Sequence, residues 1–327
     1  MQWLNKDMDI VETRKKVRGA TWFFVSLIVT YLIVLAVLLF SGTGNRISMV
    51  QNLLISQGMI FVPTIIYILI TKCDIRNTLR IRKTHWSAIF IVPVFVLALE
   101  PVMSVINSIS LLWVDSATTE LATGLVAKYP FWVSTALMAF TPCIVEELAY
   151  RGVILGSYRY SSRIWAIVIS GLLFGAMHMN FNQMAYAVVL GMMLGLLAEV
   201  TGSILPTMLA HFCFNEISVC ISYFVYHNNA LKSIVESTAK NTVSTKELII
   251  TIVSLTPFAI GGLCVAFALL YALAVINGRK EEAFGMFRRQ RIFDDDGSEI
   301  KKSGIISIPL VIALAVCIGF MVISEIL

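Results

Sequence analysis

Charged residues are scarce in this sequence: only 14% of its 327 residues are Asp, Glu, Lys or Arg. A soluble globular domain usually has about 25% charged and about 45–50% apolar residues. Here 58% of the residues are hydrophobic and the mean hydropathy is +0.83. The shortage of charge therefore argues against a soluble domain and indicates a protein embedded in lipid.

Several other features are missing. No linker rich in Pro, Gly or Ser and no tandem repeat divides the chain, so we expect residues 1–327 to form a single integral membrane domain. The six cysteines include no Cys-x-x-Cys pair and lie mostly in or beside hydrophobic runs, which argues against disulfides. The net charge is +5, but no basic groove with interleaved aromatic residues occurs, so we expect no nucleic-acid partner.

The sequence has instead a series of long apolar runs. A bilayer core about 30 Å thick needs about 20 apolar helical residues to cross it, and the backbone must satisfy its own hydrogen bonds there. The sequence therefore predicts an all-α, polytopic membrane protein with about eight or nine transmembrane helices. They are placed near residues 20–40, 53–71, 87–113, 131–157, 163–180, 184–200, 204–226, 248–276 and 305–326. The two short helices in the middle of this series could instead be partly re-entrant.

The distribution of basic residues supports this helix count, because cytoplasmic loops carry an excess of Lys and Arg. With nine crossings and a cytoplasmic N-terminus, 20 of the 25 Lys and Arg residues fall on the cytoplasmic side and 5 outside. We therefore expect a multi-pass protein with its N-terminus in the cytoplasm. Its short cytoplasmic connections and lack of retention signals favour a bacterial cytoplasmic membrane.

Ionisable residues inside apolar helices are the strongest functional signal, because each costs roughly 2.5–3.5 kcal/mol to insert. The densest group is Glu146, Glu147 and Arg151 on the fourth predicted helix. Helical residues are about 100° apart, so Glu147 and Arg151 share a face while Glu146 points elsewhere. The spacing predicts an ion pair between Glu147 and Arg151, and leaves Glu146 free for a proton, a metal or a water.

Two further groups lie on later helices. His178 follows Phe174 by four residues on the fifth helix, and His211 and Asn215 are four apart on the seventh. His211 and Asn215 share a face, as two donors to one oxyanion would. Taken singly, these residues fit a satisfied buried histidine or interhelical hydrogen bonds equally well. It is their joint occurrence with the paired glutamates that indicates a site.

The depth of the three groups can be compared at about 1.5 Å per residue. His211 lies about 10 Å, Glu146 about 16 Å and His178 about 22 Å from the cytoplasmic ends of their predicted helices. These depths agree only loosely. They favour a chamber that opens towards the cytoplasm.

The ordered set resembles the CAAX protease and bacteriocin-processing family, also called Abi, which includes the type II prenyl-protein endopeptidases. The family pattern matches in Glu146-Glu147-x-x-x-Arg151, Phe174-x-x-x-His178 and His211-x-x-x-Asn215. The resemblance covers residues 131–226, which we predict to be the catalytic core helices.

This resemblance implies an intramembrane endopeptidase. Glu146 with His178 would activate the attacking water, and His211 with Asn215 would stabilise the oxyanion. Glu147, with Arg151 in a supporting role, would hold the site together.

The resemblance leaves the cofactor open. The family is often catalogued as metallopeptidases, and Glu146, His178 and His211 could together bind a divalent metal such as zinc. The His-Glu-x-x-His helix that would make zinc compelling is absent, so we favour a glutamate-activated water without zinc. The sequence also lacks the Gly-x-Ser-Gly and Gly-x-Gly-Asp motifs of the serine and aspartyl intramembrane proteases.

Two other classes of function compete with this reading. The chain could be a peptidase-like scaffold, regulator or bacteriocin-immunity protein without turnover. A transporter would need broken helices or inverted repeats around a polar site, and the sequence shows no matching halves. The expected partners are the lipid bilayer and a membrane-associated peptide or protein substrate. Nothing in the sequence indicates an oligomeric state.

Overall fold

The computed structural model describes residues 10–114, 118–232, 244–287 and 305–326. Within these residues all regular elements are helical, and eight helices are long and apolar enough to cross a membrane. A further apolar helix, α8 (Arg163–Ala176), is shorter, with 14 residues. The protein is therefore an all-α, polytopic integral membrane protein, as the sequence predicts.

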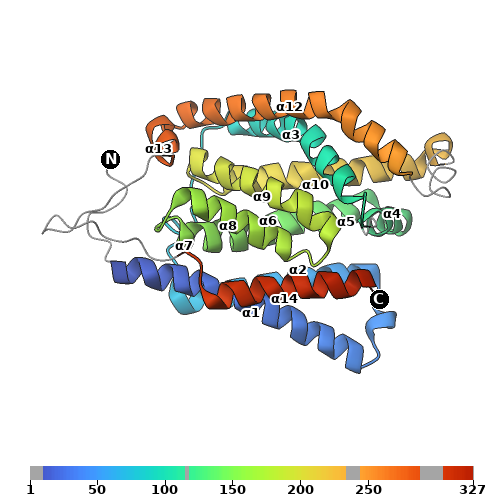
Figure 1. Ribbon diagram of the computed structural model, residues 1–327, viewed down its shortest axis with the longest axis horizontal. Coiled ribbons are helices and arrows are strands. Elements are labelled where there is room, and N and C mark those ends of the chain that lie inside the picture. Colours follow the sequence, from blue (N-terminus) through green and yellow to red (C-terminus); the bar gives the residue numbers. More distant parts are fainter. Residues whose placement is uncertain (1–9, 115–117, 233–243, 288–304, 327) are drawn as a thin grey trace, which may run out of the picture.

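The long helices alternate in direction along one common axis (Figure 1). They are α1 (Ile10–Phe40), α2 (Met49–Thr71), α3 (Ala88–Ser110), a composite span (Phe131–Tyr158), α9 (Phe181–Thr201), α10 (Leu205–His227), α12 (Thr245–Ile276) and α14 (Ile308–Ile326). Shorter elements are the 3₁₀ turn η1 (Gly44–Arg46), α4 (Thr118–Lys128) and α13 (Lys280–Gly285). The largest boundary error is at α1, predicted to begin near residue 20, because its charged first turns continue the helix beyond the apolar run.

The helices form three layers (Figure 1). Helices α3 and α12 lie side by side along one face of the bundle, and α1, α2 and α14 form the opposite face. Between them lie α8, α9, α10 and the composite span. All the motif residues belong to this middle layer, so the outer layers hold their polar groups away from lipid.

The composite span changes its helical form around the paired glutamates. Two π-helical stretches, η2 and η3, interrupt it, and Pro142, which has no backbone N–H, lies just after the first of them. Its successive pieces are α5 (Phe131–Thr135), η2 (Ala136–Phe140), α6 (Thr141–Glu147), η3 (Leu148–Leu155) and α7 (Gly156–Tyr158). π-Helical turns are rare and frequently mark functional sites. The short α-helical piece with both glutamates thus lies between two such stretches.

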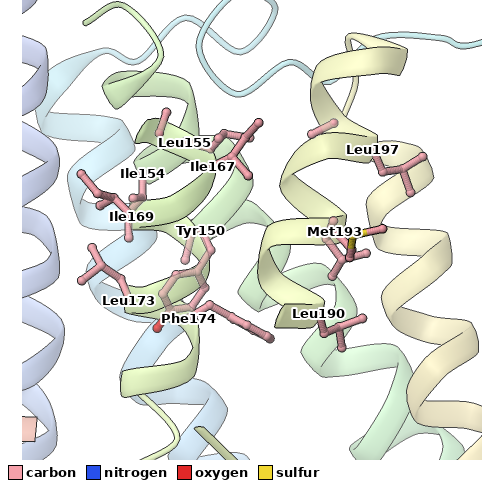
Figure 2. Close-up of a cluster of buried hydrophobic side chains, with 14 of the residues drawn as sticks. Tyr150, Ile154, Leu155, Ile167, Ile169, Leu173, Phe174, Leu190, Met193 and Leu197 are labelled. Atoms are coloured by element: carbon pink, nitrogen blue, oxygen red, sulfur yellow. The ribbon is translucent and has the colours of Figure 1, made fainter. Parts of the chain in front are cut away.

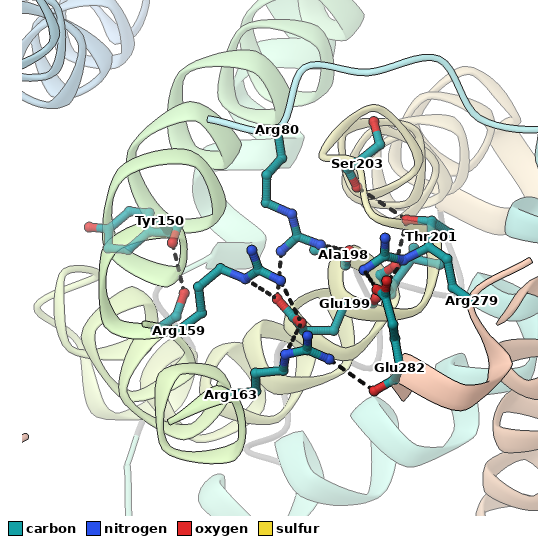
Figure 3. Close-up of polar contacts among 12 residues, drawn as sticks. Arg80, Tyr150, Arg159, Arg163, Ala198, Glu199, Thr201, Ser203, Arg279 and Glu282 are labelled. Atoms are coloured by element: carbon teal, nitrogen blue, oxygen red, sulfur yellow. Dashed lines mark hydrogen bonds and ion pairs between the residues drawn. The ribbon is translucent and has the colours of Figure 1, made fainter. Parts of the chain in front are cut away.

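One end of the bundle gathers buried charge around Glu199, close to the end of α9 (Figure 3). Its carboxylate pairs with Arg80 at 2.6 Å, Arg159 at 3.1 Å and Arg163 at 3.7 Å, and its carbonyl accepts from Arg279 at 3.3 Å. Burial lowers the pKa of Arg80 to about 9, against the opposing effect of Glu199, so Arg80 stays cationic at neutral pH. We call this the arginine-rich end; it ties together three interhelical connections and the start of α8.

The crossing of α3 and α12 depends on Gly262. A Cβ atom at this position would collide with the backbone carbonyl of Ala98. We therefore expect Gly262→Ala to force the helices apart and to lower the free energy of unfolding by about 1–3 kcal/mol, seen as a lower Tm in detergent. At Gly261 a Cβ would meet open space, so Gly261→Ala should leave the Tm unchanged or slightly raised. Equal losses in both variants would contradict the close crossing.

Candidate active site

The ion pair predicted from helical spacing is present and completely buried. Arg151 donates from Nη1 to Glu147 Oε1 at 2.7 Å, and both side chains have no exposed surface. The second terminal nitrogen of Arg151 donates to the carbonyl of Gly191 on α9 at 3.2 Å. Because a Cβ at Gly191 would meet the backbone of Gly171 and the ring of Phe174 closely, glycine there lets α9 pack against α8 beside the pair. The pair therefore ties the composite span to α9.

His211 connects the two glutamates. Its Nδ1 lies 2.9 Å from Glu147 Oε1, and its Nε2 lies 3.9 Å from Glu146 Oε2. An ionised carboxylate can only accept, so His211 Nδ1 donates to Glu147 and the ring orientation is fixed. Glu147 thus binds both Arg151 and His211 through one oxygen, while Nε2 faces Glu146.

The ring of Phe174, on α8, is a common contact of the site. Arg151 lies over its face at 4.4 Å, and the rings of His178 and His211 contact it edge to face, with centroids 5.1 and 5.6 Å away. His178 Nδ1 lies 2.9 Å from the Phe174 carbonyl. A carbonyl oxygen only accepts, so Nδ1 carries the proton and Nε2 is left as the acceptor. Phe174 therefore positions three of the motif side chains.

Glu146 has a partner that the sequence analysis missed. Gln57 on α2 donates from Nε2 to Glu146 Oε1 at 2.9 Å. Gln57 is not ionisable, yet an amide in an apolar helix is also a signal, because it needs a hydrogen-bonding partner in lipid. Gln57 thus brings a fourth helix to the site.

The polar groups face a common cavity of about 670 Å³. Glu146, His178, His211, Asn215 and Gln57 all line it. Glu146 is largely buried but reaches the cavity, whereas the Glu147 side chain is completely enclosed. The structure therefore separates the paired glutamates, as the helical spacing predicts, with one in the cavity and one in an ion pair.

The cavity extends away from the arginine-rich end. Its outermost lining comes from the first turns of α2, the last turns of α10 and the beginning of the composite span, as seen in Asn52, Ser56, Leu137, Ser218 and Ser222. The sequence predicts that the arginine-rich end is cytoplasmic and that the chamber opens there. The residues that line the cavity lie towards the opposite end, so they do not support a cytoplasmic opening.

Apolar packing occupies the space between the site and the arginine-rich end. Side chains of η3, α8 and α9 interlock there, and Tyr150 and Phe174 lie at the edge of the cluster nearest the site (Figure 2). Residues of η3 such as Ile154 and Leu155 have no exposed surface. This cluster fixes the composite span against α8 and therefore fixes the glutamates relative to His178.

The proposed metal ligands do not form a metal site. In the described ranges no group of three or more His, Cys, Asp or Glu side chains has metal-binding geometry. Glu146, His178 and His211, the three candidates from the sequence, are included in that statement. The residues present thus do not fit a permanently bound zinc ion, and no step below depends on one.

The seven motif residues occur in one continuous stretch of chain. Residues 128–217 match the family model of the type II CAAX prenyl endopeptidases, Rce1-like. This match confirms the resemblance to the CAAX protease family and supports, at the level of the family, an intramembrane protease of the CAAX type.

The Rce1-like stretch covers less than a third of the 327 residues. It contains every predicted site residue from Glu146 to Asn215, whereas Gln57 lies outside it. No curated protein and no solved structure gives a match to this chain. The geometry around the Rce1-like stretch therefore has to be interpreted from the residues themselves.

Proposed function

We propose that this protein is an intramembrane endopeptidase that hydrolyses a peptide bond with a water activated by glutamate and histidine. The observation that carries the proposal is the convergence of Glu146, His178, His211 and Asn215 on one cavity within the bundle. They come from the composite span, from the turn after α8, where the helix ends at Ala176 and not near residue 180 as the sequence predicts, and from α10. A carboxylate and an imidazole can activate a water as general base and hydrogen-bond acceptor, and an imidazolium and an amide can stabilise an oxyanion.

The first step is the attack of water. His178 Nδ1 is held by the Phe174 carbonyl, so its Nε2 can accept a hydrogen bond from a water that also contacts Glu146. Glu146 takes one proton from this water as the oxygen forms a bond to the carbonyl carbon of the peptide. The donation from Gln57 to Glu146 Oε1 keeps the carboxylate turned towards the cavity. Glu146 is thus the general base and His178 orients the water.

The second step is the collapse of the tetrahedral intermediate. In its cationic form His211 has an Nε2–H to donate, because Nδ1–H is already bound to Glu147. This proton and the amide of Asn215, one turn later, stabilise the negative oxygen. As the C–N bond breaks, protonated Glu146 returns its proton to the leaving amine. Arg151 pairs with Glu147 and holds it in place for His211.

The substrate is proposed to be a membrane-associated peptide or protein, and the membrane to be a bacterial cytoplasmic membrane. The test is cleavage of a library of quenched fluorescent peptides by the detergent-purified protein. We expect cleavage of a subset of the library, and we expect it to remain unchanged after dialysis against a chelator, because no step uses a metal. Loss of cleavage on chelation, with recovery on adding zinc, would contradict the metal-free mechanism.

A peptidase-like scaffold or immunity protein is the alternative function. It would keep the buried Glu147–Arg151 pair for stability but would not need Glu146 in the cavity. Absence of cleavage across the library, from protein that remains folded in detergent, would favour it.

Gln57 provides a separate prediction. Gln57→Leu removes a hydrogen bond to a charged group, worth about 1.5–3 kcal/mol. If that bond holds Glu146 for proton transfer, kcat should fall about tenfold or more while KM changes little. The matched control is Gln183→Leu, which removes another cavity amide that does not bind Glu146. Equal kcat values for Gln57→Leu and wild type would show that Gln57 does not position the base.

A further inference from the structure

The location of the cavity relative to the two ends of the bundle determines how a substrate can reach Glu146. Helices α2 and α10 both line it with residues far from the arginine-rich end. On α2 they begin at Asn52, three residues after the helix starts, and on α10 they continue to Ser222, five residues before it ends. On α8 they are confined to its last turn and the residues that follow. The cavity therefore runs from Glu146 towards the end that carries α4 (Figure 1).

The arginine-rich end is closed by backbone packing. The connection between α2 and α3 lies across it: the Arg80 carbonyl accepts from the Ile204 N–H at 3.1 Å, and the Arg82 carbonyl accepts from Ser203 Oγ at 2.6 Å. A Cβ at Gly156 would collide with the carbonyl of Thr78, so this connection also touches the end of the composite span.

Side-chain packing completes the closure. The Glu199 cluster fills the space between the connections (Figure 3), and the apolar cluster of Figure 2 lies beneath it. Arg80 and Glu199 themselves are only 2% and 1% exposed. In the part of the chain that the structure describes, no lining residue of the cavity belongs to this end.

The two ends also differ in charge. Among the described residues, the antiparallel order of the helices places 13 Lys and Arg residues in the connections and helix ends of the arginine-rich end, and four at the opposite end. Connections with this excess remain in the cytoplasm during insertion. The mouth of the cavity, at the opposite end, is therefore extracytoplasmic. This outcome reverses the cytoplasmic opening that the depths of the motif residues suggested.

We infer that the substrate is a polypeptide segment on the extracytoplasmic side of the membrane, and that it reaches Glu146 between α2 and α10 from that side. That the segment is a substrate rests on the proposed function. The side from which it enters follows from the position of the cavity and the distribution of charge alone. The mouth suits an extended chain, because Asn52, Ser56, Ser218 and Ser222 offer amides and hydroxyls to its backbone along apolar walls.

Cysteine labelling tests the side of entry. The exposed native thiols, Cys220 and Cys264, are first changed to Ser, and this parent is the blank. Asn52→Cys and Ser218→Cys then each add one thiol at the mouth, on two different helices, and Lys83→Cys adds one at an exposed position of the arginine-rich end. A membrane-impermeant maleimide is added to intact cells. We expect both mouth cysteines to be labelled at once and Lys83→Cys only after permeabilisation. The opposite pattern, or mouth cysteines that stay unlabelled even in detergent, would overturn the inference.

The same variants test whether the peptide uses this route. In detergent, a bulky maleimide on Ser218→Cys should reduce cleavage of the fluorescent peptides at least tenfold, whereas the same label on Lys83→Cys should leave it unchanged. Full activity of labelled Ser218→Cys would overturn the proposed route. If wild-type protein cleaves no peptide, the proposed function fails, but the labelling pattern still decides which side the cavity faces.

Discussion

Replacing Glu146 by Gln should lower kcat by at least about 10²–10⁴-fold, the usual contribution of a general base, while the protein stays folded. Glutamine keeps the shape of the side chain, and its carbonyl oxygen can still accept the hydrogen bond from Gln57, but it cannot take a proton from water. The measurement is steady-state cleavage of a fluorescent peptide, together with the Tm of each variant in the same detergent.

The matched control is a second carboxylate within the membrane. Glu216 lies on α10, accepts a hydrogen bond from Thr135 at 2.9 Å, and does not line the cavity. Glu216→Gln should therefore leave kcat close to the wild-type value. Wild-type turnover by Glu146→Gln would rule out the mechanism, and a comparable loss in Glu216→Gln would show that the effect is not specific to the site.

Arg151→Ala should cause the largest loss of stability among the site variants. It removes the guanidinium that pairs with Glu147, and leaves that enclosed carboxylate with the His211 imidazole but without its arginine partner. Breaking one partner of a buried ion pair typically costs about 3–5 kcal/mol, and the contact with the Phe174 ring is lost as well. We expect a marked fall in Tm, and a fall in activity because Glu147 no longer orients His211.

Two further variants separate this effect from a general loss of charge. Glu12→Ala breaks an exposed ion pair with Lys16 on α1 and should cost at most about 1 kcal/mol. The double variant Glu147→Gln/Arg151→Leu removes both buried charges. Its loss of stability should therefore be smaller than the sum of the losses in the single variants Glu147→Gln and Arg151→Leu. Additive losses would mean that the two residues do not act as a pair.

Local features of the sequence predicted the class of fold and the arrangement of the paired glutamates. Composition and run length predicted the membrane helices, because burial in lipid is a property of each segment by itself. Spacing predicted the contact between Glu147 and Arg151, since residues four apart on one helix are neighbours wherever the helix lies. The structure confirms that contact at 2.7 Å.

Contacts between segments that are far apart in the sequence could not be predicted from local spacing. Gln57 precedes Glu146 by 89 residues, and nothing in the local pattern of α2 indicates which helix it faces. The bond between His211 and Glu147 joins residues 64 apart. The sequence grouped His211 with Asn215 and, as possible metal ligands, with Glu146 and His178, but not with Glu147. Both contacts depend on which helices pack together, and no spacing within one helix encodes that choice.

The level of the site within the bundle also depends on contacts between distant segments. The sequence placed His211 too close to the arginine-rich end, because it assumed that every helix starts at the membrane surface. In the structure α10 starts beneath the α2–α3 connection, where the Ile204 N–H binds the Arg80 carbonyl, and this brings His211 to the level of Glu146. The sequence by itself thus determined the membrane-embedded helices and the residues of the motif, because hydropathy and helical periodicity are local. The tertiary structure alone decided at which level of the bundle these residues meet, which partner holds Glu146 and towards which end the cavity lining extends, because all three follow from how distant segments pack against one another.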